Sequence, residues 1–471
     1  MLKAYCKVLS VILLISFTSI SQIYLVREGN IYNSWSRIRS ADAESWSKMI
    51  SDDQGSAILN LEFKDNSVYI IGVINTVVYS SSGFLYVSKF TIFGAKEWEF
   101  SIKAKISEYI DYLFDSNNNL YLLFRNNKSY LCFVKLSPSG TVLLYKEILK
   151  YIDSWQFSLE LGQNDSIYIF GKTYYPPQLN ILSFSNFGDL LWNISYNVSL
   201  QDVYYPFPFH TVKDSKFNFY ISLVNNSKYT ITKVNSSGAL VSQLDYQAPE
   251  TLMIKNDNLF FVKSYSYYNH SILKINTTGS LIKEVYVSGF TTGDMSFQCI
   301  NDIFIWDYYS QLKAYDLNLT LKWVFNISEY IPTSHQYYWY RNYIAQDIQN
   351  NVYMIQPNDI GDLSILKING SGYLQSRIIW GGPNDEIVTS LLLDPENNIY
   401  FICFYNGYDA WGFPHTYRFL VKNPKDGGVL LLPERIFDAR DYFFFSCIGI
   451  SCIISAIALF SILKSPKKRI K

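Results

Sequence analysis

A unit of about 45 residues recurs along this chain, and the repetition constrains the fold more than any other feature. Each copy contains one or two polar turn residues and then a short apolar strand with Tyr or Phe, as in NSVYIIG from Asn66. Successive copies start 40 to 52 residues apart. The eight copies begin at Asn66, Asn118, Asp165, Phe217, Asp257, Asn301, Asn350 and Asn397.

An alternating strand and a tight turn follow each marker, for example TKVNSSGALVS and LKINGSGYLQS. Gly at the turn supplies a positive φ without steric cost, as a tight hairpin requires. Each copy carries four strand signals, and a ring of such units leaves no open sheet edge. The sequence therefore predicts an all-β fold, a β-propeller of eight four-stranded blades. Seven blades remain an alternative, because the copy from Asp257 to Trp306 is short and irregular.

The last blade and the closure of the ring can be predicted from the two ends of the repeat region. For blade eight we predict strands at Ile387 to Leu393, Ile399 to Phe404, Tyr417 to Val421 and Val429 to Leu432. Propeller rings are usually closed by strands from both ends of the chain. The segment Glu44 to Ile50, ESWSKMI, is similar to the fourth-strand sequences KEWEF and LLWNI and is the candidate closing strand.

The last two copies also resemble a known repeat family. WGG from Trp380, an acid at Asp385, LLLD with NNIYF, and the earlier LKINGSG resemble the SBBP-type (bacterial-type) β-propeller repeat. The fourth strands with Trp98, Trp192 and Trp323 are similar to repeats of pyrroloquinoline-quinone propellers. The resemblance implies a propeller fold and an extracellular, membrane-anchored location. It carries over no binding or catalytic residue, because the repeat pattern is structural.

The N-terminus has the features of a signal peptide. Lys3 and Lys7 precede an apolar run, and small residues at Ser19 and Ser21 are spaced for signal peptidase, so we predict a signal peptide over 1–21. An uncleaved anchor stays open, because the apolar stretch continues to Val26.

The C-terminus has the features of a membrane span. Residues 442–463 contain no charge, and as a helix they would extend about 33 Å, enough to cross the hydrocarbon core. The basic tail 464–471 is predicted to stay in the cytoplasm. A lead-in segment, 22–43, and the propeller, 44–437, would then lie outside the cell membrane, with a single span or, if the N-terminal segment is retained, two.

Aromatic residues collect in the predicted loops of one face. In a propeller, the connections from the second to the third strand and from the fourth to the next blade share a face. Tyr and Trp offer large contact area with a polar edge, which suits recognition of a protein or glycan. The alternative is that these loops pack on each other or on the membrane surface. The predicted partner-binding face comprises Tyr174, Tyr175, Tyr204, Tyr205, Phe207, Tyr267, Tyr308, Tyr338, Trp339, Tyr408, Trp411 and Phe413.

No pattern of metal or cofactor ligands accompanies these loops. The four histidines lack short ligand spacing such as HxxxH, and we expect them to face solvent. DSNNN at Asp115 and DPENN at Asp394 do not fit the calcium-loop spacing and are predicted to be turns. We therefore expect no metal and no cofactor. The histidines are His210, His270, His335 and His415.

Acids at Asp53, Asp153 and Asp385 precede the first strand of three blades. Paired carboxylates can support glycosidase chemistry, but Asp also accepts hydrogen bonds from backbone N–H groups in such turns. We favour this second, structural role. No GxSxG elbow, P-loop or GxGxxG junction is present. Enzyme activity is thus supported by fold analogy alone.

Two further sets of residues bear on the cellular setting. Cys132, Cys299 and Cys403 lie in or beside apolar strand runs and are predicted to be buried free thiols. Acceptor sites for N-glycosylation all fall within the proposed ectodomain. They are Asn127, Asn164, Asn193, Asn197, Asn225, Asn235, Asn269, Asn276, Asn318, Asn326 and Asn369.

Together these features predict a cell-surface, single-pass membrane protein whose extracellular propeller binds a protein or glycan partner through its aromatic loops. Nucleic acid is not expected as a partner, because the predicted ectodomain has more acidic than basic residues. Two alternatives stay open. One is an extracellular enzyme, either a quinone-dependent dehydrogenase or a glycan hydrolase or lyase. The other is a structural component of a surface layer.

Overall fold

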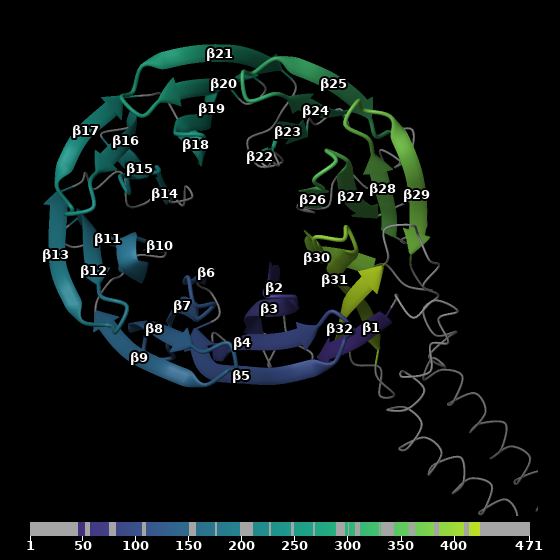
Figure 1. Cartoon of the computed structure of the whole chain (residues 1–471), viewed down its shortest axis with the longest axis horizontal. Coiled ribbons are helices and arrows are strands. Elements are labelled where there is room, and N and C mark those ends of the chain that lie inside the picture. Colours follow the sequence, from purple (N-terminus) through teal and green to yellow (C-terminus); the bar gives the residue numbers. More distant parts are fainter. Residues whose placement is uncertain are drawn as a thin grey trace, which may run out of the picture.

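The structure is a computed structural model, and it describes eighteen stretches of the chain. They are 46–51, 57–74, 82–105, 110–149, 157–174, 177–197, 211–225, 228–245, 249–266, 269–288, 297–299, 301–306, 311–328, 330, 343–357, 363–380, 386–408 and 414–423. Within them the chain forms eight antiparallel sheets of four strands. The sheets are arranged as blades around a ring, with the first strand of each blade nearest the centre (Figure 1). The eight-bladed β-propeller predicted from the sequence is confirmed.

The strands of a blade are called A to D from the centre outward, and the first four blades follow in chain order. Blade 1 contains β2 (Ala57–Lys64), β3 (Ser67–Ile74), β4 (Ser82–Thr91) and β5 (Lys96–Lys105). Blade 2 contains β6 (Asp111–Phe114), β7 (Leu120–Arg125), β8 (Leu131–Leu136) and β9 (Val142–Leu149). Blade 3 contains β10 (Phe157–Leu161), the 3-10 turn η1 (Gln163–Asp165), β11 (Ile167–Tyr174), β12 (Pro177–Phe184) and β13 (Leu190–Asn197). Blade 4 contains β14 (Thr211–Lys213), β15 (Phe219–Asn225), β16 (Lys228–Val234) and β17 (Leu240–Asp245).

The remaining blades include the short, irregular copy of the repeat, which forms parts of blades 5 and 6. Blade 5 contains β18 (Pro249–Lys255), β19 (Asn258–Ser266), β20 (Asn269–Asn276) and β21 (Leu281–Ser288). Blade 6 contains β22 (Phe297–Cys299), β23 (Ile303–Trp306), β24 (Gln311–Tyr315) and β25 (Leu321–Asn326). Blade 7 contains β26 (Tyr343–Gln346), β27 (Val352–Pro357), β28 (Leu363–Ile368) and β29 (Leu374–Trp380). Blade 8 contains β30 (Glu386–Leu393), β31 (Ile399–Tyr408), β32 (Pro414–Asn423) and β1 (Trp46–Ser51).

The ring is closed by β1, which pairs with β32 in antiparallel register from Trp46 opposite Lys422. The closing strand predicted at Glu44 to Ile50 is confirmed to within two residues. The prediction for the fourth strand of blade 8 was wrong, because β1 occupies the outer position that we assigned to Val429 to Leu432. That segment lies outside the described residues.

The hydrophobic core is divided into clusters that lie between neighbouring blades. Middle strands are buried on both faces, as in β3 and β7, and read as near-continuous apolar runs. Outer strands are half exposed and alternate, as in β13. One cluster joins Tyr220 of blade 4 to Leu259 and Leu273 of blade 5. Each blade thus needs its neighbours to cover it, which is why the repeat has to close on itself.

The C–D hairpins follow the predicted glycine rule with one exception. Gly140 and five other turn glycines have a positive φ, and the hairpins carry a β-bulge beside the turn. A Cβ on Gly140 would lie 2.6 Å from the ring of Trp98 in the preceding blade, so this glycine also permits close packing between blades. In blade 6 the left-handed position is taken by Leu319, which is buried.

The predicted signal segment, 1–21, and the predicted span, 442–463, lie outside the described residues. Among the described residues, no helix is long and apolar enough to cross a membrane.

Candidate functional site

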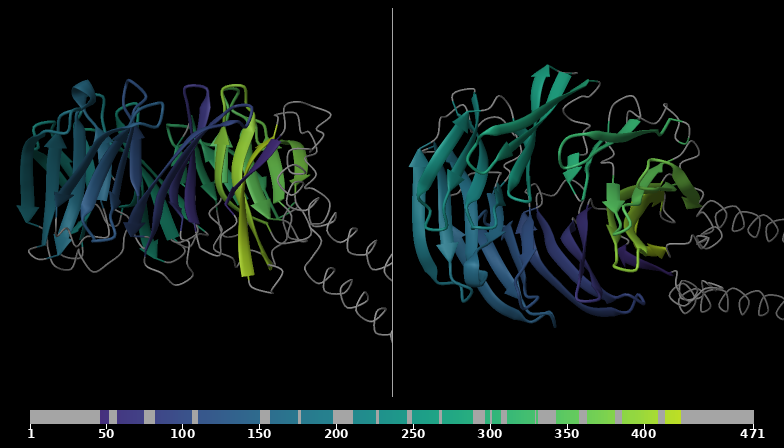
Figure 2. Two further views of the ribbon diagram at one scale, coloured as in Figure 1. Left: turned by 90° about the horizontal axis from the view of Figure 1, so that it is seen from below. Right: turned by 45° about the horizontal axis from the view of Figure 1, so that its top comes forward.

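The ring has two faces that differ in their connections. The A–B and C–D turns lie on one face, here called the turn face, and the B–C and D–A connections lie on the other, the loop face. Figure 2 shows the blades from the side, with their strands running from one face to the other. The longest connections are D–A connections of the loop face, such as 198–210 between β13 and β14, whereas B–C connections such as 175–176 between β11 and β12 are as short as the turns.

The predicted aromatic residues all belong to the connections of the loop face or to the strand ends that lead into them. Tyr174 and Tyr408 were expected in loops but are the last residues of β11 and β31, paired with Pro177 and Pro414. The strands are longer than predicted because pairing continues to the start of each B–C connection. The other predicted residues lie outside the described ones: Tyr175, Tyr204, Tyr205, Phe207, Tyr267, Tyr308, Tyr338, Trp339, Trp411 and Phe413.

A polar cluster on the inner strands of blades 2, 3 and 4 was not predicted from the sequence. It consists of Asp111 on β6, Ser158 and Glu160 on β10, and Thr211 and Lys213 on β14. The Ser158 and Thr211 hydroxyls are 2.5 Å apart, and the Thr211 hydroxyl donates to Glu160 Oε1 at 3.4 Å. Lys213 Nζ lies 3.5 Å from Glu160 Oε2 and 2.6 Å from the carbonyl oxygen of Leu161 in the same strand as Glu160. We call these five residues the inner-strand cluster.

The two carboxyl groups of the inner-strand cluster hold protons unusually tightly. Burial raises the pKa of Glu160 to about 7, against the opposing charge of Lys213 and with the help of Asp111. Burial also raises the pKa of Asp111 to about 6, although the backbone N–H groups of Leu159 and Tyr112 donate to it at 2.7 and 2.9 Å. The Glu160 side chain is 18% exposed. A partly accessible carboxyl that titrates near neutral pH is typical of functional sites.

The sequence contains a pattern that could have indicated the inner-strand cluster. The inner strand of blade 3 alternates apolar Leu159 and Leu161, which pack toward blade 2, with polar Ser158 and Glu160. The inner strand of blade 4 has the same alternation in Thr211 and Lys213. The alternation is visible in the sequence. That the two polar rows face each other depends on the order of the blades.

The turn acids, by contrast, form a repeated structural device on the turn face. In blade 8, Asp394 Oδ1 accepts the backbone N–H groups of Glu396 and Asn398, and its Oδ2 accepts from the Asn398 amide and the Tyr400 hydroxyl. The prediction that this segment and DSNNN at Asp115 are turns is confirmed. The same device recurs at Asp115, Asp214 and Asp347.

A lysine on strand C extends this device to the next blade. Lys135 forms an ion pair with Asp115 at 3.1 Å, lies over the ring of Tyr121, and donates to the Asn186 carbonyl of blade 3. In blade 4, Lys233 and Tyr220 both donate to the Thr277 carbonyl of blade 5. These contacts tie each A–B turn to the C–D turn of its neighbour and stabilise the ring.

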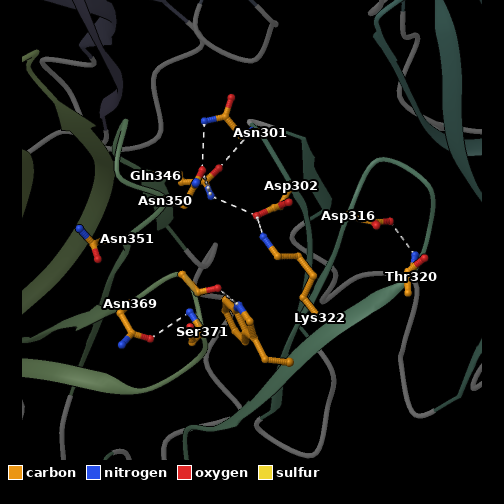
Figure 3. A network of polar contacts seen from close by, with 12 residues as sticks. Asn301, Asp302, Asp316, Thr320, Lys322, Gln346, Asn350, Asn351, Asn369 and Ser371 are labelled. Atoms are coloured by element: carbon orange, nitrogen blue, oxygen red, sulfur yellow. Dashed lines mark hydrogen bonds and ion pairs between the residues drawn. The ribbon is translucent and has the colours of Figure 1, made fainter.

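Between blades 6 and 7 a different set of polar residues serves this purpose (Figure 3). Lys322 Nζ donates to Asp302 at 2.6 Å, and the Gln346 amide donates to the same oxygen at 3.4 Å. The backbone N–H of Asn301 donates to Gln346 Oε1 at 3.0 Å. Each of these polar groups has a partner within the network. We therefore interpret the network as a junction between blades and not as a ligand site.

The histidine prediction needs one correction. His270, on β20, is 1% exposed and does not face solvent as expected, because it lies in a middle strand in which six of the eight residues are buried. His210 and His335 lie outside the described residues, and of His415 only the backbone, in β32, is described. No group of three or more metal-ligating side chains occurs within the described ranges.

Cysteines and glycosylation acceptors follow the predicted positions where they are described. Cys132 and Cys403 are buried free thiols, as predicted. Asn235, Asn276 and Asn369 stand at C–D turns, where their side-chain oxygens accept backbone N–H groups of the turn. Attachment of glycans at these and the other acceptors stays a prediction. The acids Asp53, Asp153 and Asp385 lie outside the described residues.

The sheet topology defines this chain as an eight-bladed β-propeller. No family model matches the chain, and no curated protein matches it. Among solved structures it is similar to BamB from Moraxella catarrhalis, with 14% identity and a TM-score of 0.45 over 79% of this chain and 97% of that one. It is also similar to the Dos1 propeller, with 11% identity and a TM-score of 0.46 over 79% of this chain and 94% of that one.

A third similar structure is the Neurospora crassa Pan2 WD40 domain, with 11% identity and a TM-score of 0.39 over 83% of this chain and 99% of that one. At such values the likeness concerns the fold alone and carries no argument about function. The SBBP-type repeat therefore stays a resemblance of the sequence.

Proposed function

We propose that this chain is a cell-surface, single-pass membrane protein whose extracellular propeller binds a protein or glycan partner through the loop face. The observation that supports the proposal is that the A–B and C–D turns lie on one face of the ring and the B–C and D–A connections on the other. The aromatic residues singled out from the sequence fall in B–C and D–A connections or at the strand ends leading into them. Five of the twelve residues fall in the long D–A connections 198–210 and 327–342, and connecting segments on a scaffold are the usual place for recognition.

The strand bounds support a common location for these residues. Tyr174 and Tyr408 end B strands in blades 3 and 8, and B strands all run toward the loop face.

The test is capture of partners by the full-length chain held in lipid nanodiscs, using a glycan panel and extracts of surface proteins. The double variant Tyr338→Ser with Trp411→Ser is expected to lower capture at least tenfold without changing the melting temperature. Tyr286→Ser, an exposed aromatic of the outer strand β21, is the matched control and should leave capture unchanged. Equal capture by all three proteins would contradict the proposal.

A second candidate is a propeller enzyme that cleaves glycans, favoured by the inner-strand cluster. Glycan hydrolysis requires two carboxyl groups, one of them protonated near the working pH. Glu160 and Asp111 are two carboxyl groups whose pKa values are raised to about 7 and about 6, so that one of them can hold a proton near neutral pH. Turnover of any glycan that is lost in Glu160→Gln, with capture retained, would establish this activity; no turnover across the panel would exclude it for the glycans tested.

A further inference from the structure

The turn face carries the most exposed apolar side chains of the described residues. Phe93 and Phe187 stand at the tips of C–D turns in blades 1 and 3, Ile348 stands at the tip of the A–B turn in blade 7, and Tyr373 directly follows the C–D turn of blade 7. Their exposed fractions are 77%, 80%, 72% and 78%. We call these four residues the apolar tips.

A rim of exposed apolar residues lies next to the apolar tips. The D strands of blades 2 to 5 each begin, directly after the turn, with two exposed apolar residues, and the D strand of blade 6 begins with one. The rim comprises Val142, Leu143, Leu190, Leu191, Leu240, Val241, Leu281, Ile282 and Leu321. Scattered single apolar residues need no explanation, but a face rimmed in this way marks an interaction surface.

Both ends of the described propeller emerge at this same face. Asn423, the last residue of β32, pairs with Ile399, which directly follows the A–B turn of blade 8. Trp46, the first residue of β1, pairs with Lys422 beside it. The chain therefore leaves the ring from the turn face in both directions. Residues 424–441 separate that point from the apolar segment that begins at Tyr442.

The charged side chains of the turn face include no basic excess that would favour binding to an anionic lipid surface. Exposed Asp65, Asp189 and Asp257 are interspersed with exposed Lys96 and Lys216. Apolar tips without a basic excess fit a zwitterionic lipid surface, which they would enter by burial of apolar area rather than by charge attraction.

We propose that the turn face rests on the lipid surface of the membrane, with the apolar tips in the interfacial layer and the loop face directed away from it. The proposal rests on the membrane anchoring included in the proposed function. It adds to that function an orientation of the propeller in which the partner-binding loops point away from the membrane.

The test places an environment-sensitive fluorophore at either end of one outer strand. Full-length chain carrying Phe187→Cys or Asn197→Cys is labelled with nitrobenzoxadiazole and reconstituted in phosphatidylcholine vesicles. Asn197 is the matched control, because it is exposed at the opposite end of β13. The background carries Ser at four other positions, since Cys132 and Cys403 are buried. Those positions are Cys6, Cys299, Cys447 and Cys452.

We expect the emission at position 187 to shift to the blue by about 10 nm or more in vesicles, as for a probe entering the interfacial layer, and the emission at 197 to stay unchanged. A label at Tyr373→Cys should behave like the one at 187. The proposal is overturned if 187 is unshifted, or if 187 and 197 shift alike. A shift at 187 without lipid that grows with protein concentration would instead identify a second copy as the occupant.

Alkaline carbonate extraction separates this proposal from the anchoring on which it builds. If the chain resists extraction but 187 is unshifted, anchoring stands and the orientation fails. If the chain is extracted, anchoring fails, and vesicles added to the extracted chain decide the orientation by the same shift. The proposal excludes glycans at the C–D turn acceptors Asn235, Asn276 and Asn369, and a glycan found on any of them would contradict it by holding that turn away from the lipid.

Discussion

Asp111 and Asp115 lie four residues apart in blade 2, at the two ends of the same short strand, and their carboxyl groups behave oppositely. Burial raises the pKa of Asp111 to about 6. Burial acts on Asp115 too, but hydrogen bonds from Asn119 and the ammonium of Lys135 more than offset it, and its pKa lies below the ordinary value. The number of donors that the surrounding chain supplies, rather than burial alone, separates a structural acid from one that can titrate.

The difference between these acids reflects their positions in the repeat. Asp115 belongs to the A–B turn, where local geometry brings two backbone N–H groups and an Asn amide to the same carboxyl group. Asp111 and its neighbour Glu160 lie on inner strands, where Asp111 has one local donor, the N–H of Tyr112, and the other partners come from the next blade. The turn device repeats around the ring, whereas within the described part of the chain the inner-strand cluster belongs to the place where blades 2, 3 and 4 meet.

The largest effect is expected for Asp115→Ala. It removes the acceptor of the turn and leaves Lys135 without its counter-ion at a site where the Asp side chain is 1% exposed. We expect a loss of about 3 kcal/mol in the free energy of unfolding, measured by urea denaturation at pH 7. Asp316→Ala, at an exposed C–D turn with two backbone donors, is the control and should cost about 1 kcal/mol. If the two variants lose the same free energy of unfolding, the expected difference between buried and exposed turn acids is wrong.

A smaller effect of opposite sign is expected for Glu160→Gln. The pKa of Glu160 is about 7 in the folded chain against an ordinary 4.5, so its ionised form destabilises the fold at pH 8. This destabilisation fades as the pH falls from 7 toward 4.5. The variant should therefore gain about 2 kcal/mol at pH 8, since part of the gain is offset by the lost contact with Lys213, and nothing at pH 4.5. Denaturation curves over this pH range measure it, and a variant less stable than the parent at pH 8 would refute the assignment.

The smallest effect is expected for Lys135→Met. The pKa of Asp115 is lowered in the fold, so its stabilising contribution is present above the unfolded-state pKa and is lost as the pH falls through the folded-state value. Removing Lys135 should cost about 1 kcal/mol at pH 7, because the hydrogen bonds of the turn remain, and less in acid. Lys128→Met, in an exposed turn of the same blade, should cost nothing measurable. A loss that does not change with pH would show that packing of the lysine stem, not its charge, is what the ring requires.

The repeat made most of the fold predictable from sequence. Turn residues and strand periodicity are local, so the Asp394 turn, the glycine turns and the closing strand near Trp46 could be recognised from short stretches. The outer strand of blade 8 was misassigned because its partner comes from the far end of the chain, and only ring closure selects it. His270 was misplaced because β20 begins earlier than expected, so that this residue lies in a buried middle strand and not in the loop before it.

The candidate sites divide in the same way. The loop-face aromatics could be located by counting strands, because the parity of a four-stranded blade fixes the face on which each connection lies. The inner-strand cluster could not be located so, since Glu160 and Lys213 are 53 residues apart and meet only because consecutive blades stand side by side (213 − 160 = 53). The apolar tips are visible in the sequence as single residues and become one surface only in the ring.

By itself, the sequence determined the blade, its turns and a candidate for the closing strand, because these depend on periodicity and on backbone conformations that few residue types allow. The tertiary structure decided that the ring has eight blades, which carboxyl groups titrate near neutral pH, and at which face both ends of the described propeller emerge. Those properties depend on contacts between blades. Such contacts arise from the geometry of closure, which no single repeat encodes.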